Sequence, residues 1–139
     1  MLACLFVVAC QSVVSPLRLP IDAQVTSIEA WPNNAYDFAT KTILGSSKLS
    51  TMEEISPVMS FLRAKNQAMR RFDGAFSTPT HTVVIHSTSE SKVILYVGQD
   101  WMGGINDTAA EAGQIRRTRL TATEKARLWE LLRLPGQKS

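Results

Sequence analysis

The chain has 139 residues, of which 45% are apolar and 19% are charged. This length fits one domain of ordinary size, and the apolar share excludes an intrinsically disordered chain. The formal net charge is +3, and the excess lies after Thr108, chiefly in Arg116, Arg117 and Arg119. So small a local excess does not indicate a nucleic acid as the partner.

The chain begins with an apolar run, Leu2 to Val8, followed by the small residue Ala9 and by Cys10. An apolar region of this kind before a small residue is typical of a secretory signal. The run Val7-Val8-Ala9-Cys10 resembles the lipobox of bacterial lipoproteins. The resemblance implies cleavage before Cys10, diacylation of its thiol and acylation of the new amino group, with fatty acids such as palmitate. In that family Gln11 implies transport to the outer membrane, on its periplasmic face.

One feature departs from that pattern, because no Lys or Arg precedes the apolar run. Either the reading frame starts upstream of Met1, or the run is not a signal. In the second case it is a buried N-terminal strand of a cytoplasmic protein, extended by Val13 and Val14. No other stretch approaches the roughly 18 apolar residues of a membrane span.

The only two cysteines, Cys4 and Cys10, lie within the first ten residues. A disulfide framework or a thiolate metal site in the domain is therefore excluded. We expect a signal segment over residues 1–9, a linker over 10–22 that contains Pro16 and Pro20, one domain over 23–135 and a tail over 136–139.

The N-terminal half of this domain is predicted to contain one strand and one helix. Residues 24–31 are rich in β-branched side chains, and Pro32-Asn33-Asn34 ends the strand. Residues 35–43 fit either a second short strand or an irregular aromatic cover, and residues 45–47 a loop. A capping box at Ser50 and Glu53 opens a helix over about 51–70, which Pro57 either kinks or restarts.

The C-terminal half is predicted to contain a central hairpin over about 81–98, with strands at 82–86 and 92–97. A long loop over 99–114 follows, and then a short edge strand over 115–120. A second capping box at Thr121 and Glu124 opens a helix over about 121–134. The predicted fold is α+β, an antiparallel sheet of three or four strands with both helices packed on one side.

No residue pattern indicates catalysis. His81 and His86 lie five residues apart on one predicted strand, so they face opposite sides and cannot share a metal. The chain has no Gly-x-Ser-x-Gly motif that would position a nucleophilic serine. We therefore expect no enzyme activity, no cofactor and no metal.

Two features are candidates for partner binding. Trp101 and Met102 lie in the predicted loop after the hairpin, where an aromatic side chain could enter a pocket of a partner. The alternative is that Trp101 covers one end of the core. Arg116, Arg117 and Arg119 could contact an anionic lipid or an acidic protein surface, or could simply protect an edge strand from unwanted pairing.

The sequence thus suggests a non-enzymatic lipoprotein of the bacterial envelope that is anchored through Cys10 and binds another envelope protein. The alternative is a soluble interaction module, similar in role to an inhibitor or immunity protein. A small hydrolase has the least support, since no polar residues converge on a candidate cleft.

Overall fold

The computed structural model describes residues 17–134, except for 35, 38, 44, 72–76, 90–91 and 106–114. The predicted signal segment, the acylation site at Cys10, the first part of the linker and the tail lie outside these residues. Among the described residues, none of the helices is long and apolar enough to cross a membrane.

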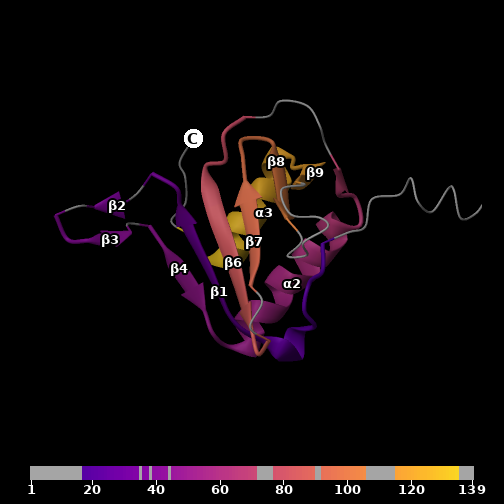
Figure 1. Ribbon diagram of the computed structural model, residues 1–139, viewed down its shortest axis with the longest axis horizontal. Coiled ribbons are helices and arrows are strands. Elements are labelled where there is room, and N and C mark those ends of the chain that lie inside the picture. Colours follow the sequence, from indigo (N-terminus) through magenta and orange to yellow (C-terminus); the bar gives the residue numbers. More distant parts are fainter. Residues whose placement is uncertain are drawn as a thin grey trace, which may run out of the picture.

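The described residues form an α+β fold, with one large antiparallel sheet and two α-helices (Figure 1). In chain order the elements are η1 (Asp22–Gln24), β1 (Val25–Pro32), β2 (Tyr36–Asp37), β3 (Thr42–Ile43), β4 (Ser47–Leu49), α2 (Met52–Asn66), β5 (Arg70–Arg71), β6 (His81–Ser87), β7 (Val93–Val97), β8 (Trp101–Ile105), β9 (Ile115–Arg119) and α3 (Ala122–Leu132).

The large sheet contains seven of the described strands, in the order β4-β1-β6-β7-β8-β9-β5. All six neighbouring pairs are antiparallel. The α+β class and the central hairpin, β6 with β7, were predicted correctly. The predicted number of three or four strands is wrong. The three-residue strand β4, the two-residue strand β5 and the glycine-containing strand β8 give no clear sequence pattern.

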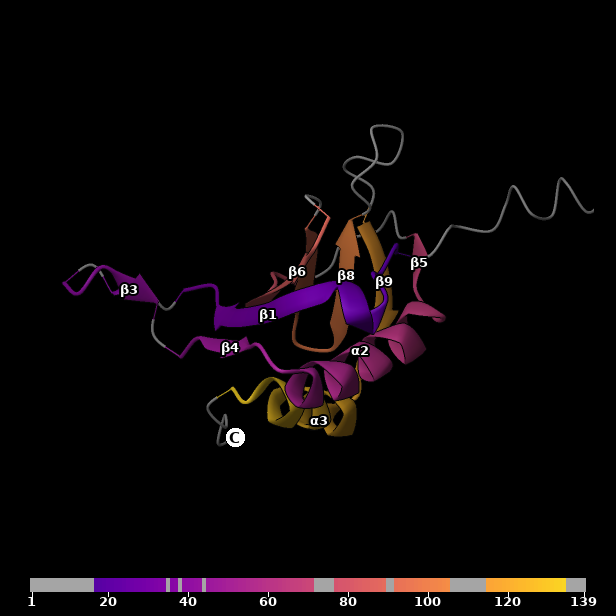
Figure 2. The ribbon, with the colours of Figure 1, turned by 90° about the horizontal axis from the view of Figure 1, so that it is seen from below.

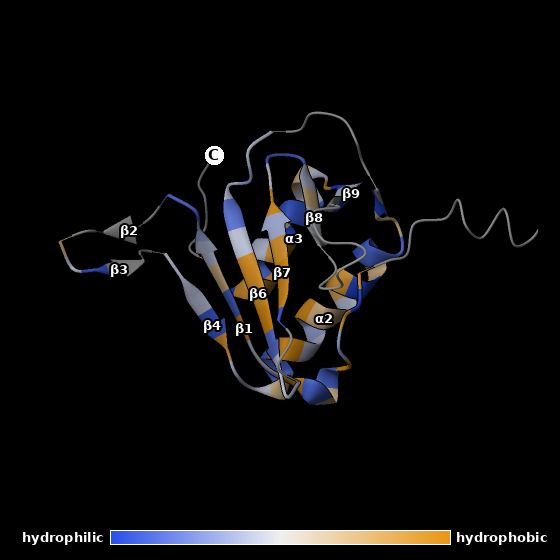
Figure 3. Ribbon diagram, in the orientation of Figure 1, coloured by the Kyte–Doolittle hydropathy of each residue, from blue (hydrophilic) through white to orange (hydrophobic). Residues whose placement is uncertain are grey.

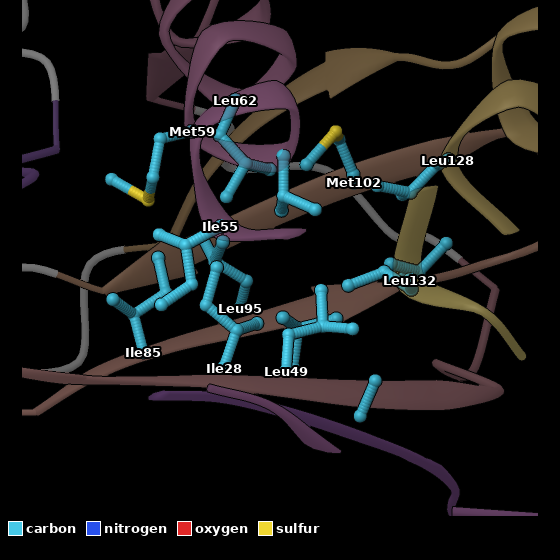
Figure 4. Close-up of a cluster of buried hydrophobic side chains, with 14 of the residues drawn as sticks. Ile28, Leu49, Ile55, Met59, Leu62, Ile85, Leu95, Met102, Leu128 and Leu132 are labelled. Carbon is cyan, nitrogen blue, oxygen red and sulfur yellow. The ribbon is translucent and has the colours of Figure 1, made fainter. Parts of the chain in front are cut away.

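Both helices pack on the same side of the sheet, as Figure 2 shows. The alternation of side chains along each strand places Ile28, Ile85 and Leu95 beneath the helices, and all three are almost fully buried. From α2, Ile55, Met59 and Leu62 reach this layer, and Leu128 and Leu132 of α3 complete it (Figure 4).

Each helix begins at a capping box. Thr51 caps α2, with its side chain accepting a hydrogen bond from the backbone of Glu54, so this box lies one residue later than predicted. Thr121 and Glu124 cap α3 as predicted. Pro57 neither ends nor restarts α2, which continues from Met52 to Asn66.

Residues 17–22, which the sequence assigned to the linker, pack along α2. Leu17 is only 3% exposed, and its backbone forms two hydrogen bonds with the side chain of Asn66, of 2.9 and 2.8 Å. Further along, Arg63 donates to the carbonyl oxygen of Pro20 (3.2 Å) and forms an ion pair with Asp22. The segment that enters the domain is therefore part of the fold.

Candidate functional site: the open face and the arginine edge

The side of the sheet that faces away from both helices is called the open face. Figure 1 looks onto it, with α3 behind β6 and β7. The strand register places the following residues on this face: Glu29, Trp31, Lys48, Arg70, Thr82, Val84, His86, Ile94, Tyr96, Trp101, Gly103, Arg117 and Arg119. Its surface is both apolar and basic, whereas the helix side of the sheet is the core.

Apolar and aromatic residues occupy the middle of the open face. Ile94 of β7 is 40% exposed, although it lies in a central strand. Tyr96 and Trp31 are half-buried and flank Thr82 in one line across β7, β6 and β1. Figure 3 shows the apolar residues concentrated along β6 and β7. Ile94 and Tyr96 are next neighbours on the open face of β7, whereas Trp31 lies two strands away on β1. An isolated apolar side chain on a surface is ordinary, whereas neighbouring apolar and aromatic side chains offer a surface that a partner can cover.

The line of residues continues from Tyr96 to Gly103 of β8 and then to Arg117 of β9. A Cβ atom at Gly103 would lie 2.2 Å from the carbonyl oxygen of Arg116 and 3.0 Å from Cγ of Arg117. Such distances are too short for any side chain. Glycine at this position therefore allows β9 and the stem of Arg117 to approach β8 closely.

Trp101 and Met102 do not lie in a loop, so the prediction of a loop over 99–114 is wrong for residues 101–105. Both belong to β8, and Trp101 is 5% and Met102 0% exposed. The indole N–H of Trp101 donates to Ser77 Oγ (2.9 Å), and the guanidinium of Arg117 lies 5.4 Å from the ring centroid. Trp101 thus completes the packing at one end of the sheet, and neither residue offers a side chain to a partner.

The strands β5 and β9 contain five arginines and no acidic residue: Arg70, Arg71, Arg116, Arg117 and Arg119. We call this group the arginine edge. It is not the edge strand that the sequence predicted, because β9 pairs on its outer side with β5. Arg70 lies opposite Arg117 and Arg71 opposite Arg116. Like charges in directly opposite positions destabilise a sheet.

The arginines of this edge differ in their access to solvent. Arg116 is only 2% exposed and lies on the helix side, so its side chain is not part of the open face. Arg117 is half-buried beside Trp101, and burial lowers the pKa of its guanidinium while the carboxylate of Asp100 raises it. Arg70 and Arg119 are exposed. Of the three arginines that the sequence suggested for binding, Arg119 is the most accessible.

The two histidines lie on opposite sides of the sheet, as predicted. On the open face, His86 Nε2 is 2.8 Å from a carboxylate oxygen of Glu29. On the helix side, His81 is 4% exposed, and its ring meets that of Trp129 edge-on at 4.5 Å. Burial lowers the pKa of His81, and the nearby positive charge of Lys125 lowers it further. Within the described residues, no group of three or more His, Cys, Asp or Glu side chains could hold a metal ion.

Sequence reasoning missed two exposed members of this site, Ile94 and Arg70. The apolar residues on both faces of the second hairpin strand predicted complete burial, and this concealed the exposure of Ile94. The signal for β5 was the pair Arg70-Arg71 directly after a helix, but a two-residue strand has no period to recognise.

Comparison of the chain with protein-family models, curated protein sequences and solved structures found no match.

Proposed function

We propose that the protein is a lipoprotein of the bacterial cell envelope, anchored through Cys10, whose domain binds a partner protein and catalyses no reaction. The anchor is supported by the resemblance of Val7-Val8-Ala9-Cys10 to a lipobox. Gln11 favours the outer membrane and its periplasmic face.

The open face is the surface proposed for the partner. Ile94 and Tyr96 are neighbours on β7, and Trp31 and the exposed Arg119 lie on the same side of the sheet. Aromatic residues and arginine are enriched where proteins bind one another, whereas lysine and glutamate are depleted there. Both helices lie on the other side of the sheet, so they leave this patch accessible (Figure 2).

The chemistry of the partner follows from the arginine edge, and this observation carries the proposal. Arg117 and Arg119 lie on the open face of β9, where Arg119 is exposed and Arg117 is half-buried near the carboxylate of Asp100. A partner with carboxylates on its surface would bind the exposed guanidinium of Arg119 through paired hydrogen bonds. The partner is therefore an acidic protein of the envelope.

The test is capture of a partner from envelope extracts by the full chain, with variants that alter exposed residues only. Ile94→Ser and Arg119→Glu change the open face, whereas Arg127→Glu makes the same charge reversal as Arg119→Glu on the exposed surface of α3, on the other side of the sheet. We expect a bound acidic protein to be lost with both open-face variants, retained with Arg127→Glu and released by salt. Equal capture by all three variants, with unchanged thermal unfolding, would contradict the proposal.

The same surface would serve a soluble inhibitor or immunity-like module. That alternative differs in compartment only, so the chemical state of Cys10 separates the two.

A further inference from the structure

The chain enters the domain at a fixed point. Leu17 is buried, and both its backbone N–H and its carbonyl are bonded to Asn66, the last residue of α2. Its side chain lies over β8, since a Cβ atom on Gly104 would be 3.1 Å from Leu17 Cδ1. Whatever precedes Leu17 must therefore approach the molecule at the C-terminal end of α2.

The distance from this point to an anchor at Cys10 is limited by covalent geometry. Residues 10 and 17 are separated by seven Cα–Cα steps, and a fully extended chain spans about 25 Å over that length. A domain of this size is about 35 Å across. If Cys10 is acylated, as the proposed function holds, the tether is shorter than the domain and Leu17 stays near the lipid.

Among the described residues, the end of the domain that holds Leu17 carries two exposed arginines. Arg18 follows Leu17 and is exposed, and Arg70 lies just beyond α2. The guanidinium of Arg70 donates to the carbonyl oxygens of Gln67 (3.0 Å) and Met69 (2.8 Å), which holds it at the C-terminal end of this helix. Arg70 also belongs to the arginine edge, so the cations of β5 and β9 adjoin the point of entry.

The opposite end of the molecule is formed by the hairpin β2–β3. Figures 1 and 2 both show this hairpin projecting beyond β1 and β4, away from β5 and from the C-terminal end of α2. It forms a separate two-stranded sheet, in which Tyr36 pairs with Ile43 and Asp37 with Thr42. If the domain is held to the membrane at Leu17, this end is therefore near the lipid and the hairpin β2–β3 is far from it.

We propose that in the anchored protein the end containing Arg18 and Arg70 lies against the anionic lipid surface, while the hairpin β2–β3 projects away from it. The short tether provides proximity, and the arginines provide attraction to lipid phosphates. Each basic residue near an anionic surface contributes about a fivefold factor to binding. The open face then lies to the side of the tether, where the partner protein can reach it.

The test measures the distance of each end from the membrane. A fluorophore is attached through a bio-orthogonal amino acid at Ala68, which is exposed directly after α2, or at Ala39, which is exposed in the hairpin turn. The lipidated full-length product is reconstituted into vesicles of phosphatidylglycerol and phosphatidylcholine that carry an acceptor on the headgroups. We expect efficient energy transfer from position 68 and weak transfer from position 39. Equal transfer from both positions would overturn the proposed orientation.

The role of charge is tested on the same preparation. Arg70→Gln and Arg18→Gln should each reduce the transfer from position 68 on anionic vesicles, and the reduction should vanish on vesicles of phosphatidylcholine alone. Lys48→Gln removes an exposed cation from β4, near the hairpin, and should have no effect. If the transfer is insensitive to both arginine variants and to lipid charge, the contact with anionic lipid is refuted.

Mass spectrometry of each preparation separates the two proposals. A chain without acyl mass on Cys10 counts against the proposed function. The orientation is then measured after a maleimide lipid is coupled to Cys10 in a Cys4→Ser chain, in which Cys10 is the only thiol. The fluorophore does not compete for this thiol, because it is attached through the bio-orthogonal amino acid. An acylated or coupled chain with no difference between positions 68 and 39 counts against the orientation alone.

Discussion

A buried imidazole connects the pH of the solution to the stability of the fold. His81 packs edge-on against Trp129 of α3, and Lys125 of the same helix lies 5.6 Å from the Trp129 ring. His81 Nδ1 is 2.9 Å from the hydroxyl oxygen of Thr80, so the ring has a polar partner while it is neutral. A proton added to this ring would place a cation in the core beside another cation.

The stability of the protein should therefore fall when the pH is lowered from 7.5 to 5.5. Burial holds the pKa of His81 below the ordinary value of 6.5, so below that pH the unfolded chain binds a proton that the native chain does not. The contribution is complete above pH 6.5 and decreases below it, by at most about 1.4 kcal/mol per pH unit for one group. Urea unfolding at the two pH values measures it. His81→Phe should lose less stability than the wild type over this range, and an equal loss would refute the assignment.

Gly103 should not tolerate even one methyl group. An added Cβ would meet the backbone of β9 at 2.2 Å, and a backbone carbonyl moves aside less easily than a side chain. Gly103→Ala should reduce the free energy of unfolding by about 1–3 kcal/mol, as overpacking does elsewhere. Denaturant unfolding checks this, with Thr26→Ala at an exposed position of β1 as the control. Equal stability of the two variants would mean that β8 and β9 are not paired as described.

At the scale of elements, a capping box fixes the first residue of each helix. The Thr121 hydroxyl accepts a hydrogen bond from the backbone N–H of Glu124 (3.1 Å), and Glu124 Oε1 accepts one from the backbone N–H of Thr121 (3.0 Å). Lys65 of α2 pairs with Glu124 at 2.8 Å, so the box also connects the two helices. These hydrogen bonds lower the pKa of Glu124.

Removal of this cap should weaken the helix and its contact with α2. Thr121→Ala should cost about 1 kcal/mol of stability, because the backbone N–H of Glu124 loses the hydroxyl that accepts its hydrogen bond. Thr123→Ala is the matched control, since Thr123 is exposed within α3 and alanine favours a helix. Thermal unfolding of both variants provides the comparison. If Thr123→Ala is as destabilising as Thr121→Ala, the capping account fails.

Elements with a strong local pattern were predictable, and elements defined by distant pairing were not. The strands β6 and β7 are rich in β-branched residues, and the capping box at Thr121 and Glu124 marked the start of α3. In contrast, β8 begins Trp101-Met102-Gly103-Gly104, which resembles a loop in sequence, and becomes a strand because β7 and β9 pair with it on either side. The same pairing buries Trp101 and Met102, which agrees with the alternative that Trp101 covers one end of the core.

At the scale of the whole molecule, the fold separates three regions with different tasks. The helix side of the sheet contains the core, the open face carries the proposed partner site, and the end of α2 with Leu17 receives the chain from Cys10. The sequence suggested arginines as contacts, but only the register of β5 and β9 distinguishes the buried Arg116 from the exposed Arg70 and Arg119. The positive charge could be predicted from composition, whereas its accessibility depends on the fold.

The acylation of Cys10 is the central claim, because the tether, the orientation and the compartment of the partner depend on it. Intact-mass analysis of the protein extracted from bacterial membranes, expressed from its own gene, tests it most directly. The account predicts a chain that begins at Cys10 and carries a diacylglyceryl group on its thiol and a fatty acyl group on its amino nitrogen. A chain that retains Met1 to Ala9 and carries no acyl mass on Cys10 would contradict it.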